Sequence, residues 1–313
     1  MSLENAGQAG KVGLTHSFVP QGPRVILFEV FLNGLLLGGM YGLIALGLNL
    51  QFGVARILNL SYGEFFLGGA FTAFFTIMLH KLNPMLSLFV SVPIAFGLNW
   101  LIYQYLMMPL IRRAPDQDAL DADVVLVTFG LLFVFQGLAL VYWSGDLRGY
   151  SFMSTPVHLL GATVAANRLL AFLGACTLAL ALFLVLRHTR LGGALRAITI
   201  DPVAASLVGV DVRQYSALAF AAGGALAAAS GMLVSTFISF TATTGVEYTL
   251  KALIVVIMAG VGRVTGTLAA GLLLGVVESL GGYLLDPALT IAINFALFMA
   301  VLLLRPTGLF TRA

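Results

Sequence analysis

Long apolar runs constrain this chain more than any other feature of its sequence. The run from Leu169 to Leu186 reads LLAFLGACTLALALFLVL, close to the ~20 residues that an α-helix needs to cross a bilayer. Comparable runs follow one another along the chain. Only helices and closed barrels satisfy their backbone hydrogen bonds in lipid, and these runs are continuous rather than alternating. They therefore predict membrane-spanning helices.

The composition supports the same conclusion. Hydrophobic residues make up 60% of the chain and charged residues 9%, against roughly 45–50% and 25% in an average soluble domain. The net charge of +3 is small and spread over loops, which favours orientation in a membrane over binding to nucleic acid. A single cysteine excludes an intrachain disulfide, and the histidines share no ligand-like spacing. We therefore predict neither a metal site nor a cofactor bound by this chain.

The predicted fold is an all-α integral membrane protein, a polytopic bundle of about eight to nine transmembrane helices. The candidate spans are 25–50, 62–80, 85–110, 124–143, 169–187, 213–239, 248–262, 265–285 and 288–304. Residues 51–62 are too polar for a plain span, so we expect at least one broken or re-entrant segment. One transmembrane domain is predicted over residues 25–305, between a polar tail at 1–24 and a tail at 306–313.

Arginines in the loops predict the orientation, because cytoplasmic loops are enriched in Lys and Arg. Loop 187–213 and the C-terminal tail both carry arginines, and we place both in the cytoplasm. Their arginines are Arg187, Arg190, Arg196, Arg213, Arg305 and Arg312. The segment RRAPDQDALDAD (112–123) predicts a second cytoplasmic loop, and 144–167 faces outside by elimination. The side of the N-terminus stays open, because 51–62 either crosses or turns back.

Small residues recur inside the spans. The motif GLLLG occurs at Gly34–Gly38 and again at Gly271–Gly275, and Gly223, Ala227 and Gly231 form a stripe. Such stripes let helix backbones approach closely in lipid, so we expect tight helix packing at these positions. A sharper interpretation, that the two GLLLG helices are relics of an internal repeat, stays open.

A short capped helix is predicted inside the arginine-rich loop. Asp201 can cap a helix N-terminus, Pro202 suits its first position, and Gly209 suits the residue past its end. These signals predict a helix over 202–208, about seven residues and ~10 Å long. Val203 and Leu207 fall on one apolar face, which needs a covering surface. Spacing alone leaves two candidates equal: lipid headgroups or a groove on a soluble partner.

The stretch ILNLSYGE, residues 57–64, is unusually polar for its surroundings. Its polar residues are Asn59, Ser61, Tyr62 and Glu64, and Asn49 precedes it. Polar side chains at membrane depth are costly, so they face a protein interior or a water-filled path. The pattern resembles a broken helix that lines a cavity near the middle of the membrane. The alternative is an interfacial loop in which Glu64 caps the next helix.

Glu278 lies deep inside the apolar run that starts at Thr265. An unpaired carboxylate there would cost roughly 2.5–3.5 kcal/mol on insertion scales. The group must therefore be protonated, paired across helices or placed on a substrate path. Enzyme motifs are lacking: we find no GxSxG, HExxH or phosphate-binding GxxxxGK[ST] segment. We expect no enzymatic activity, and ATP-driven transport would need its ATPase on another chain.

Several segments match a known family, in order and across most of the chain. They are GLLLGGMYGLIALGLNLQFGVARILNLSYGEFFLGGA (34–70), LGGALRAITIDPVAASLVGVDV (191–212), KALIVVIMAGVGRVTGTLAAGLLLGVVESL (251–280) and LLLRPTGLF (302–310). Together they resemble the high-affinity branched-chain amino acid permeases of bacterial ABC importers, in particular the LivH-type half of the permease pair. Permeases for urea and short amides share these segments, so urea or a short amide is the alternative substrate.

The resemblance implies a multi-pass permease of the bacterial plasma (inner) membrane that translocates branched-chain or other small apolar amino acids. It implies as partners a second homologous permease subunit, a periplasmic substrate-binding protein and two cytoplasmic ATP-binding subunits, which use ATP and Mg. In this family the arginine-rich loop docks on the ATPase, which favours a partner groove over lipid headgroups. The coupling residues implied are Arg196, Asp201, Pro202, Val203, Leu207 and Gly209.

The substrate pathway is predicted along the polar residues of the spans. These are Asn49, Asn59, Ser61, Tyr62, Glu64 and Glu278. The family usually has His where this chain has Tyr62, so a titratable imidazole is not required there. A facilitative channel or secondary transporter remains an alternative of another class, although neither would need the docking loop. An intramembrane enzyme would need a convergent catalytic set, which the sequence does not offer.

Overall fold

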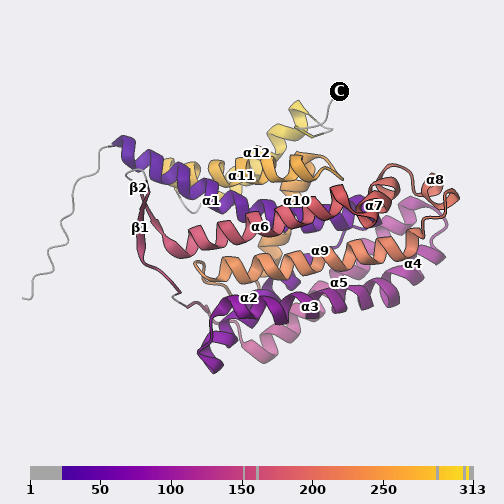
Figure 1. The fold of residues 1–313 in the computed structure, drawn as a ribbon, viewed down its shortest axis with the longest axis horizontal. Coiled ribbons are helices and arrows are strands. Elements are labelled where there is room, and N and C mark those ends of the chain that lie inside the picture. Colours follow the sequence, from indigo (N-terminus) through magenta and orange to yellow (C-terminus); the bar gives the residue numbers. More distant parts are fainter. Residues whose placement is uncertain (1–22, 151, 160–161, 287–288, 306–307, 310–313) are drawn as a thin grey trace, which may run out of the picture.

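The computed structural model describes residues 23–150, 152–159, 162–286, 289–305 and 308–309. Most of the two predicted tails, 1–24 and 306–313, lies outside these residues. The described chain is an elongated helical bundle (Figure 1). Its helices are α1 (Pro23–Leu50), α2 (Tyr62–His80), α3 (Leu88–Ile102), α4 (Met108–Arg113), α5 (Gln117–Trp143), α6 (Ala166–His188), α7 (Arg190–Ile200), α8 (Pro202–Leu207), α9 (Val212–Ser235), α10 (Thr244–Ala259), α11 (Val264–Leu284) and α12 (Thr290–Leu304).

Shorter elements complete the described chain. The π-helical turns η1 (Gln51–Ala55) and η3 (Tyr103–Met107) extend α1 and α3, and a 3-10 turn, η2 (Pro84–Ser87), precedes α3. An antiparallel hairpin of β1 (Pro156–Leu159) and β2 (Ala162–Ala165) joins α5 to α6, with Pro156 opposite Ala165. This hairpin lies within segment 144–167, which was predicted only as an outside-facing connection.

The described residues contain seven helical stretches that are long and apolar enough to cross a membrane. They are Ile26–Ala55, Tyr62–Leu79, Pro84–Arg113, Gln117–Trp143, Ala166–His188, Val212–Ser235 and Val264–Leu284. Each corresponds to one predicted span. The remaining predicted spans, 248–262 and 288–304, form the shorter helices α10 and α12. The predicted polytopic helical bundle is therefore confirmed.

The predicted break after the first span is also present. η1 ends at Ala55, and the next residue, Arg56, has a left-handed backbone with φ 54°. A left-handed residue ends a helix because its carbonyl and N–H groups leave the helical direction. Residues 56–59 have no regular structure, and α2 begins at Tyr62. The chain thus turns back at η1 instead of continuing as one long helix.

The predicted loop 112–123 is wrong in its extent. α4 includes Arg113 and α5 starts at Gln117, so the connection is short. The Asp116 carboxylate accepts a hydrogen bond from the Ala119 N–H at 2.8 Å, which caps α5. The polar residues of this segment therefore belong to the first turns of α5 and not to a loop. The Asp116 cap stabilises these turns as helix.

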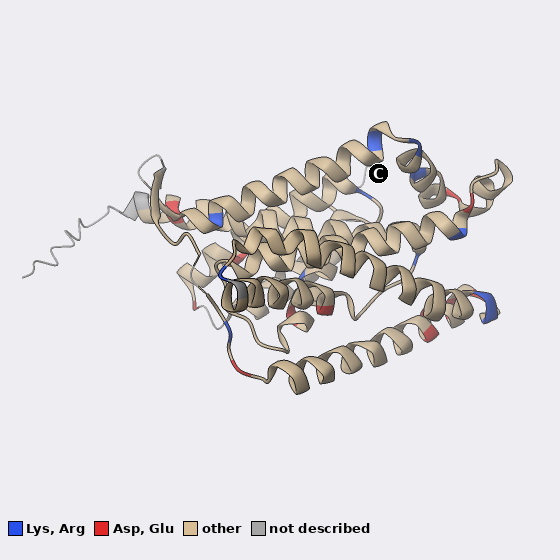
Figure 2. Ribbon diagram, turned by 60° about the horizontal axis from the view of Figure 1, so that its bottom comes forward, with Lys and Arg blue, Asp and Glu red and all other residues tan. Residues whose placement is uncertain are grey.

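The two ends of the bundle carry different elements. The hairpin and the start of α1 lie at one end, and α4, α7 and α8 lie at the other (Figure 1). The Glu29 carboxylate of α1 accepts hydrogen bonds from the N–H and the hydroxyl of Thr163, at 2.7 and 2.6 Å. Figure 2 shows the Lys, Arg, Asp and Glu positions concentrated toward both ends. The start of α1 therefore lies opposite the arginine-rich loop.

The two GLLLG motifs pack directly against each other. A Cβ atom added at Gly38 would lie 2.7 Å from the Leu272 Cα atom, and one at Gly34 would lie 2.8 Å from the Val276 Cα atom. Gly271 and Gly275 in turn face Gly42 and Gly38. Only residues without a side chain allow α1 and α11 this close approach. The predicted tight packing is confirmed, whereas the internal repeat stays a prediction.

Burial separates a central helix from peripheral ones. In α9, 83% of the apolar window is buried, against 22% in α5 and in α6. α9 packs on α1, α2 and α3, and its predicted stripe of Gly223, Ala227 and Gly231 faces the protein interior. The exposed apolar faces of α5 and α6 are suited to lipid or to another membrane chain.

Candidate functional site

The irregular segment after η1 lies in the interior of the bundle. Asn59 and Ser61 are 1% and 0% exposed. The Asn59 Oδ1 atom accepts hydrogen bonds from the Ser61 N–H at 3.1 Å and from the Ser61 hydroxyl at 2.7 Å. The Asn59 amide donates to Gln51 Oε1 at 3.4 Å, and Gln51 donates to the Phe220 carbonyl at 2.7 Å. The irregular segment is thus buried in the bundle and held by the amide side chains of Asn59 and Gln51.

The start of α2 is anchored between α1 and α10. The Tyr62 hydroxyl donates to the Ile44 carbonyl of α1 at 2.7 Å, and its side chain is 0% exposed. The Gly63 N–H donates to the Thr249 hydroxyl of α10 at 2.8 Å, and Gly63 packs against the Gly245 carbonyl with no space for a side chain. A phenol at position 62 therefore acts as a hydrogen-bond donor to the backbone.

Glu64 lies in the first turn of α2, where the helix dipole favours a negative charge. Its side chain is 7% exposed, yet neither carboxylate oxygen has a hydrogen-bond partner among the described residues. The side chain lines a cavity of about 340 Å³ between α2, α3 and α5. Glu64 thus lies at a helix start and borders a pocket, but it caps no N–H group among the described residues, and its role stays a prediction.

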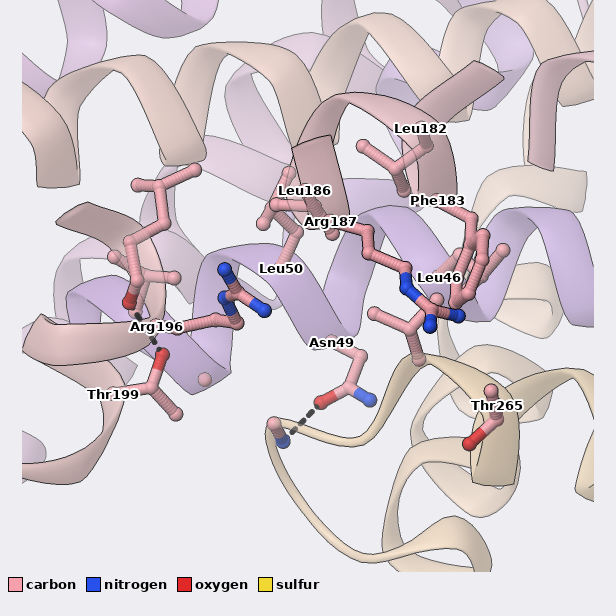
Figure 3. A pocket seen from close by; sticks show the side chains of 15 residues that line it. Leu46, Asn49, Leu50, Leu182, Phe183, Leu186, Arg187, Arg196, Thr199 and Thr265 are labelled. Carbon is pink, nitrogen blue, oxygen red and sulfur yellow. Dashed lines mark hydrogen bonds between the residues drawn. The ribbon is translucent and has the colours of Figure 1, made fainter. Parts of the chain in front are cut away.

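Asn49 belongs to a different pocket, near the end of the bundle that carries α7 (Figure 3). Its amide oxygen accepts a hydrogen bond from the Gly262 N–H at 2.7 Å, and its amide nitrogen donates to the Thr267 hydroxyl at 2.5 Å. The pocket has a volume of about 310 Å³, and Arg187 of α6 and Arg196 of α7 also line it. Asn49 thus ties α1 to the connection between α10 and α11.

The predicted capped helix is present as α8. The Asp201 carboxylate accepts hydrogen bonds from the N–H groups of Val203 at 2.8 Å and Ala204 at 3.1 Å. Pro202 occupies the first helical position, and Gly209 has a positive φ of 87° just past the end. Each feature matches its predicted role. The helix ends at Leu207, one residue earlier than predicted.

The apolar face of α8 is uncovered. Val203, Leu207 and Val208 are 68%, 83% and 78% exposed, and Ala205 on the opposite side is buried. The buried side belongs to a small apolar cluster that joins α7 and α8 to η1. Its buried members are Leu50, Val54, Leu195, Ile198, Ala205 and Ala219. α8 is therefore joined to η1 by apolar packing that runs through α7.

Glu278 lies in an ionic cluster between four helices, so it is paired across helices. One carboxylate oxygen accepts hydrogen bonds from the Tyr41 hydroxyl at 2.9 Å and from the Lys251 ammonium at 3.0 Å. The other oxygen accepts from the Asn294 amide at 2.9 Å. Lys251 also pairs with Glu247 at 2.9 Å. The cluster joins α1, α10, α11 and α12.

The predicted pathway residues therefore fall into separate environments. Asn59, Ser61 and Tyr62 support the broken segment, Asn49 borders the end of the bundle that carries α7, and Glu64 and Glu278 line different cavities. Their role in transport stays a prediction. The sequence analysis missed the partners of these groups, which are Gln51, Tyr41, Lys251 and Asn294. Lys251, a cation within a largely apolar segment, is the one whose sequence context could have indicated a pairing with Glu278.

A family model described as the branched-chain amino acid transport system permease component matches residues 30–302. The chain belongs to this permease family. As a family member with multiple membrane-spanning helices, it is a multi-pass membrane protein and a transport subunit. The match includes the broken segment, α8 and the Glu278 cluster, so these features lie in the part of the chain that defines the family.

Named relatives agree with this assignment. The high-affinity branched-chain amino acid transport system permease protein LivH of Salmonella typhimurium is 27% identical, over 90% of this chain and 94% of its own length. The corresponding protein BraD of Pseudomonas aeruginosa is 26% identical, over 91% and 95%. Among solved structures, PsaBC from Streptococcus pneumoniae in complex with Fab shares the fold, with a TM-score of 0.50 and 13% identity, over 90% of this chain and 93% of that chain.

Proposed function

We propose that this chain is the membrane-spanning permease subunit of an ATP-driven importer for branched-chain or other small apolar amino acids. The family assignment and the names of the relatives LivH and BraD support the substrate class. In this proposal the chain lies in the plasma (inner) membrane of a bacterium. A periplasmic binding protein delivers the amino acid, and two cytoplasmic ATP-binding subunits, which use ATP and Mg, drive its transport. A second homologous permease subunit completes the membrane-spanning part.

The uncovered apolar face of α8 is the observation that carries the proposal. Exposed apolar side chains cost free energy in water, about 25 cal/mol per Å², so a protruding helix with Leu207 at 83% exposure needs a partner surface. The Asp201 cap gives this short helix a fixed conformation before it meets a partner, which lowers the entropy cost of docking. A groove on an ATP-binding subunit would receive Val203 and Leu207.

The inner side of α8 suggests how docking acts on the membrane region. Leu195 and Ile198 of α7 share one apolar cluster with Leu50 and Val54, which border the break in the first span. Asn49, one residue before Leu50, holds the connection between α10 and α11. Movement of α7 and α8 would thus be transmitted both to the broken segment and to α10 and α11.

Leu207→Asp tests the coupling role. A carboxylate at this position would be desolvated in an apolar groove, so we expect no uptake of labelled leucine and reduced substrate-stimulated ATP hydrolysis. Leu207→Met is the matched control, because Met has nearly the same volume and polarity, and it should retain both activities. Immunoblots of membrane fractions check that both variants reach the membrane. Normal uptake by Leu207→Asp would rule out docking through this face.

A labelling experiment tests the proposed orientation. In a Cys176→Ala background, a cysteine at Ser206 on α8 should resist an impermeant thiol reagent that is added outside intact cells. Gly145→Cys, in the connection after α5, should react, because this residue is exposed, a Cβ atom there would meet only the Leu140 Cδ2 atom at 3.6 Å, and it lies near the opposite end of the bundle. Rapid labelling at position 206 would place α8 outside the cell and reverse the orientation.

A further inference from the structure

The pocket beside Asn49 combines apolar walls with two arginines (Figure 3). It lies between α1, α6, α7 and the connection from α10 to α11, and its volume is about 310 Å³. Arg187 lies in the last turn of α6 and Arg196 lies in α7, and none of the described lining residues is Asp or Glu. The pocket therefore carries positive charge without a carboxylate to balance it. Its apolar lining residues include Leu46, Leu50, Leu182, Leu186 and Leu195.

Both guanidinium groups of this pocket can accept a further anionic partner. No carboxylate of the described residues forms an ion pair with either arginine. Arg187 contacts the ring of Phe183, with 5.8 Å between its Cζ atom and the ring centroid, and the Arg196 Nε–H donates to the Gly192 carbonyl at 3.3 Å. These contacts leave most of the five N–H donors of each guanidinium for another acceptor. Figure 3 shows the two guanidinium groups on either side of Asn49, and both side chains line the pocket.

The pocket extends from the end of α6 toward the middle of this span. Leu182 precedes Arg187 by a rise of ~7.5 Å along the helix, and on α1 Leu46 precedes Leu50 by ~6 Å. Arginines at the end of a span lie at the level of the lipid headgroups, whereas residues one or two turns deeper lie at the level of the acyl chains. Only 22% of the apolar window of α6 is buried, so lipid reaches this helix. The pocket therefore has a basic part at headgroup level and an apolar part at acyl-chain level.

These two parts match an amphiphile with an anionic head. Guanidinium groups bind phosphate oxygens through charge-assisted hydrogen bonds. Basic pockets between spans on the cytoplasmic side, where α7 is proposed to lie, are typical sites for anionic lipid headgroups. A free phosphate ester would satisfy the arginines and leave the leucines uncovered. An acidic side chain of a soluble subunit would reach the arginines but not Leu46 and Leu182, which lie within the spans.

We propose that this pocket binds an anionic phospholipid, with its phosphate on Arg187 and Arg196 and the first part of an acyl chain against Leu182 and Leu186. The pocket volume lies at the lower end of the ~300–1,000 Å³ that is typical of small-molecule sites, which suits a headgroup and the start of one chain. A lipid bound there would hold α7 against the first span. The pocket shares three lining residues with the apolar cluster that joins α7 and α8 to η1, namely Leu50, Val54 and Leu195.

Photoactivatable lipids test the site. The full-length chain is purified with its copurifying subunits and reconstituted in phosphatidylcholine nanodiscs. These contain a small fraction of a phosphatidylglycerol probe that carries a diazirine near the start of one acyl chain. Mass spectrometry should locate the label on α1 and α6, near Leu46, Leu182 and Leu186. A phosphatidylcholine probe with the same diazirine has no net charge, and it should label these segments less by about fivefold or more, the factor expected for one arginine near an anionic lipid.

Variants and competitors assign the label to the arginines. Arg187→Gln and Arg196→Gln should each lower labelling by the phosphatidylglycerol probe about fivefold, and the double variant should lower it to the phosphatidylcholine level. Arg190→Gln removes an exposed arginine of α7 that does not line the pocket, so this matched control should label like wild type. If the pocket variants do not fold, the two probes still decide in the wild type. Unlabelled phosphatidylglycerol in the nanodisc should compete with the probe, whereas added glycerol 3-phosphate should not.

Four results would overturn the proposed lipid site. Equal labelling by both probes in the wild type would mean that the pocket accepts any lipid, and equal labelling of wild type and double variant would mean that the arginines do not hold the headgroup. Competition by glycerol 3-phosphate as strong as that by phosphatidylglycerol would indicate a site for a free phosphate ester. Labelling that appears only after soluble subunits are stripped away would assign the arginines to that interface. None of these results depends on amino acid uptake, so the proposed function is tested separately.

Discussion

Two buried carboxylates lie in the helices of this permease, and their surroundings are opposite. Glu278 is 8% exposed and accepts hydrogen bonds from Tyr41, Lys251 and Asn294. Glu64 is 7% exposed, and neither of its oxygens has a partner within the described residues. The two carboxylates are thus almost equally buried, but only Glu278 has hydrogen-bond partners among the described residues. In a membrane protein, the number of donors around a carboxylate says more about its role than its depth does.

The donors around Glu278 join it to three neighbouring helices. Its partners come from α1, α10 and α12, so one carboxylate on α11 holds four helices in register. A buried charge is expensive, and an ion pair with additional hydrogen bonds offsets that cost only when its geometry is complete. Here Lys251, Tyr41 and Glu278 form a closed triangle with sides of 2.9 to 3.0 Å. Such a cluster leaves little capacity to bind a substrate.

Glu64 has only weak compensation for its burial. Its position in the first turn of α2 supplies a favourable helix dipole, worth typically 0.3–1 kcal/mol. That contribution is smaller than the cost of leaving a charged group without hydrogen bonds. A site that keeps such a group must gain from it in function or hold a ligand that satisfies it.

The largest expected effect comes from Lys251→Met. This change keeps an unbranched side chain that is one atom shorter, and it leaves Glu278 as a buried charge without a cation, which typically costs about 3–5 kcal/mol. We expect a strongly lowered midpoint of thermal unfolding in detergent. The double variant Lys251→Met/Glu278→Gln should be more stable than the single one, because neither charge remains. An unchanged midpoint for Lys251→Met would show that the cluster does not hold the helices together.

A smaller effect is expected for Glu278→Gln. The amide keeps the shape of the side chain, and Lys251 retains its bridge to Glu247 at 2.9 Å, so the loss is that of charge-assisted hydrogen bonds, about 1.5–3 kcal/mol. Uptake per folded molecule should stay near the wild-type rate, measured in proteoliposomes with saturating binding protein. Slow uptake at normal stability would place Glu278 on the substrate path and remove the contrast with Glu64.

The sequence predicted the features that depend on local signals. The spans follow from hydropathy, the break from polar residues inside an apolar stretch, and α8 from its Asp201 cap, Pro202 and Gly209. The contact between the GLLLG motifs follows from their lack of side chains. The amphipathic helix α7 was missed, although Thr189 caps it at Gly192 and its apolar residues recur at helical spacing.

The pairing of buried groups could not be predicted, because it depends on contacts between distant segments. Tyr41 reaches Glu278 over a separation of 237 residues, and Asn49 reaches Thr267 over 218. Sequence reasoning therefore gave Glu64 and Glu278 the same role. Only the packing of α1, α10, α11 and α12 shows that Glu278 has hydrogen-bond partners. Glu64 has none among the described residues.

The smallest expected effect on stability, and the sharpest test of the contrast, is Glu64→Gln. No described residue offers this carboxylate a hydrogen-bond partner, so the neutral amide removes a buried charge and breaks none of the described hydrogen bonds. We expect the unfolding midpoint to stay equal or to rise, within about 0.5 kcal/mol of wild type or on the stable side. If Glu64 lies on the predicted substrate pathway, uptake of labelled leucine should nevertheless fall, because the amide lacks the negative charge of the carboxylate. Glu247→Gln, an exposed carboxylate in a partly solvated ion pair, is the control for a simple loss of charge and should affect neither property by much. A strongly destabilised Glu64→Gln would mean that Glu64, like Glu278, has partners that hold the fold together.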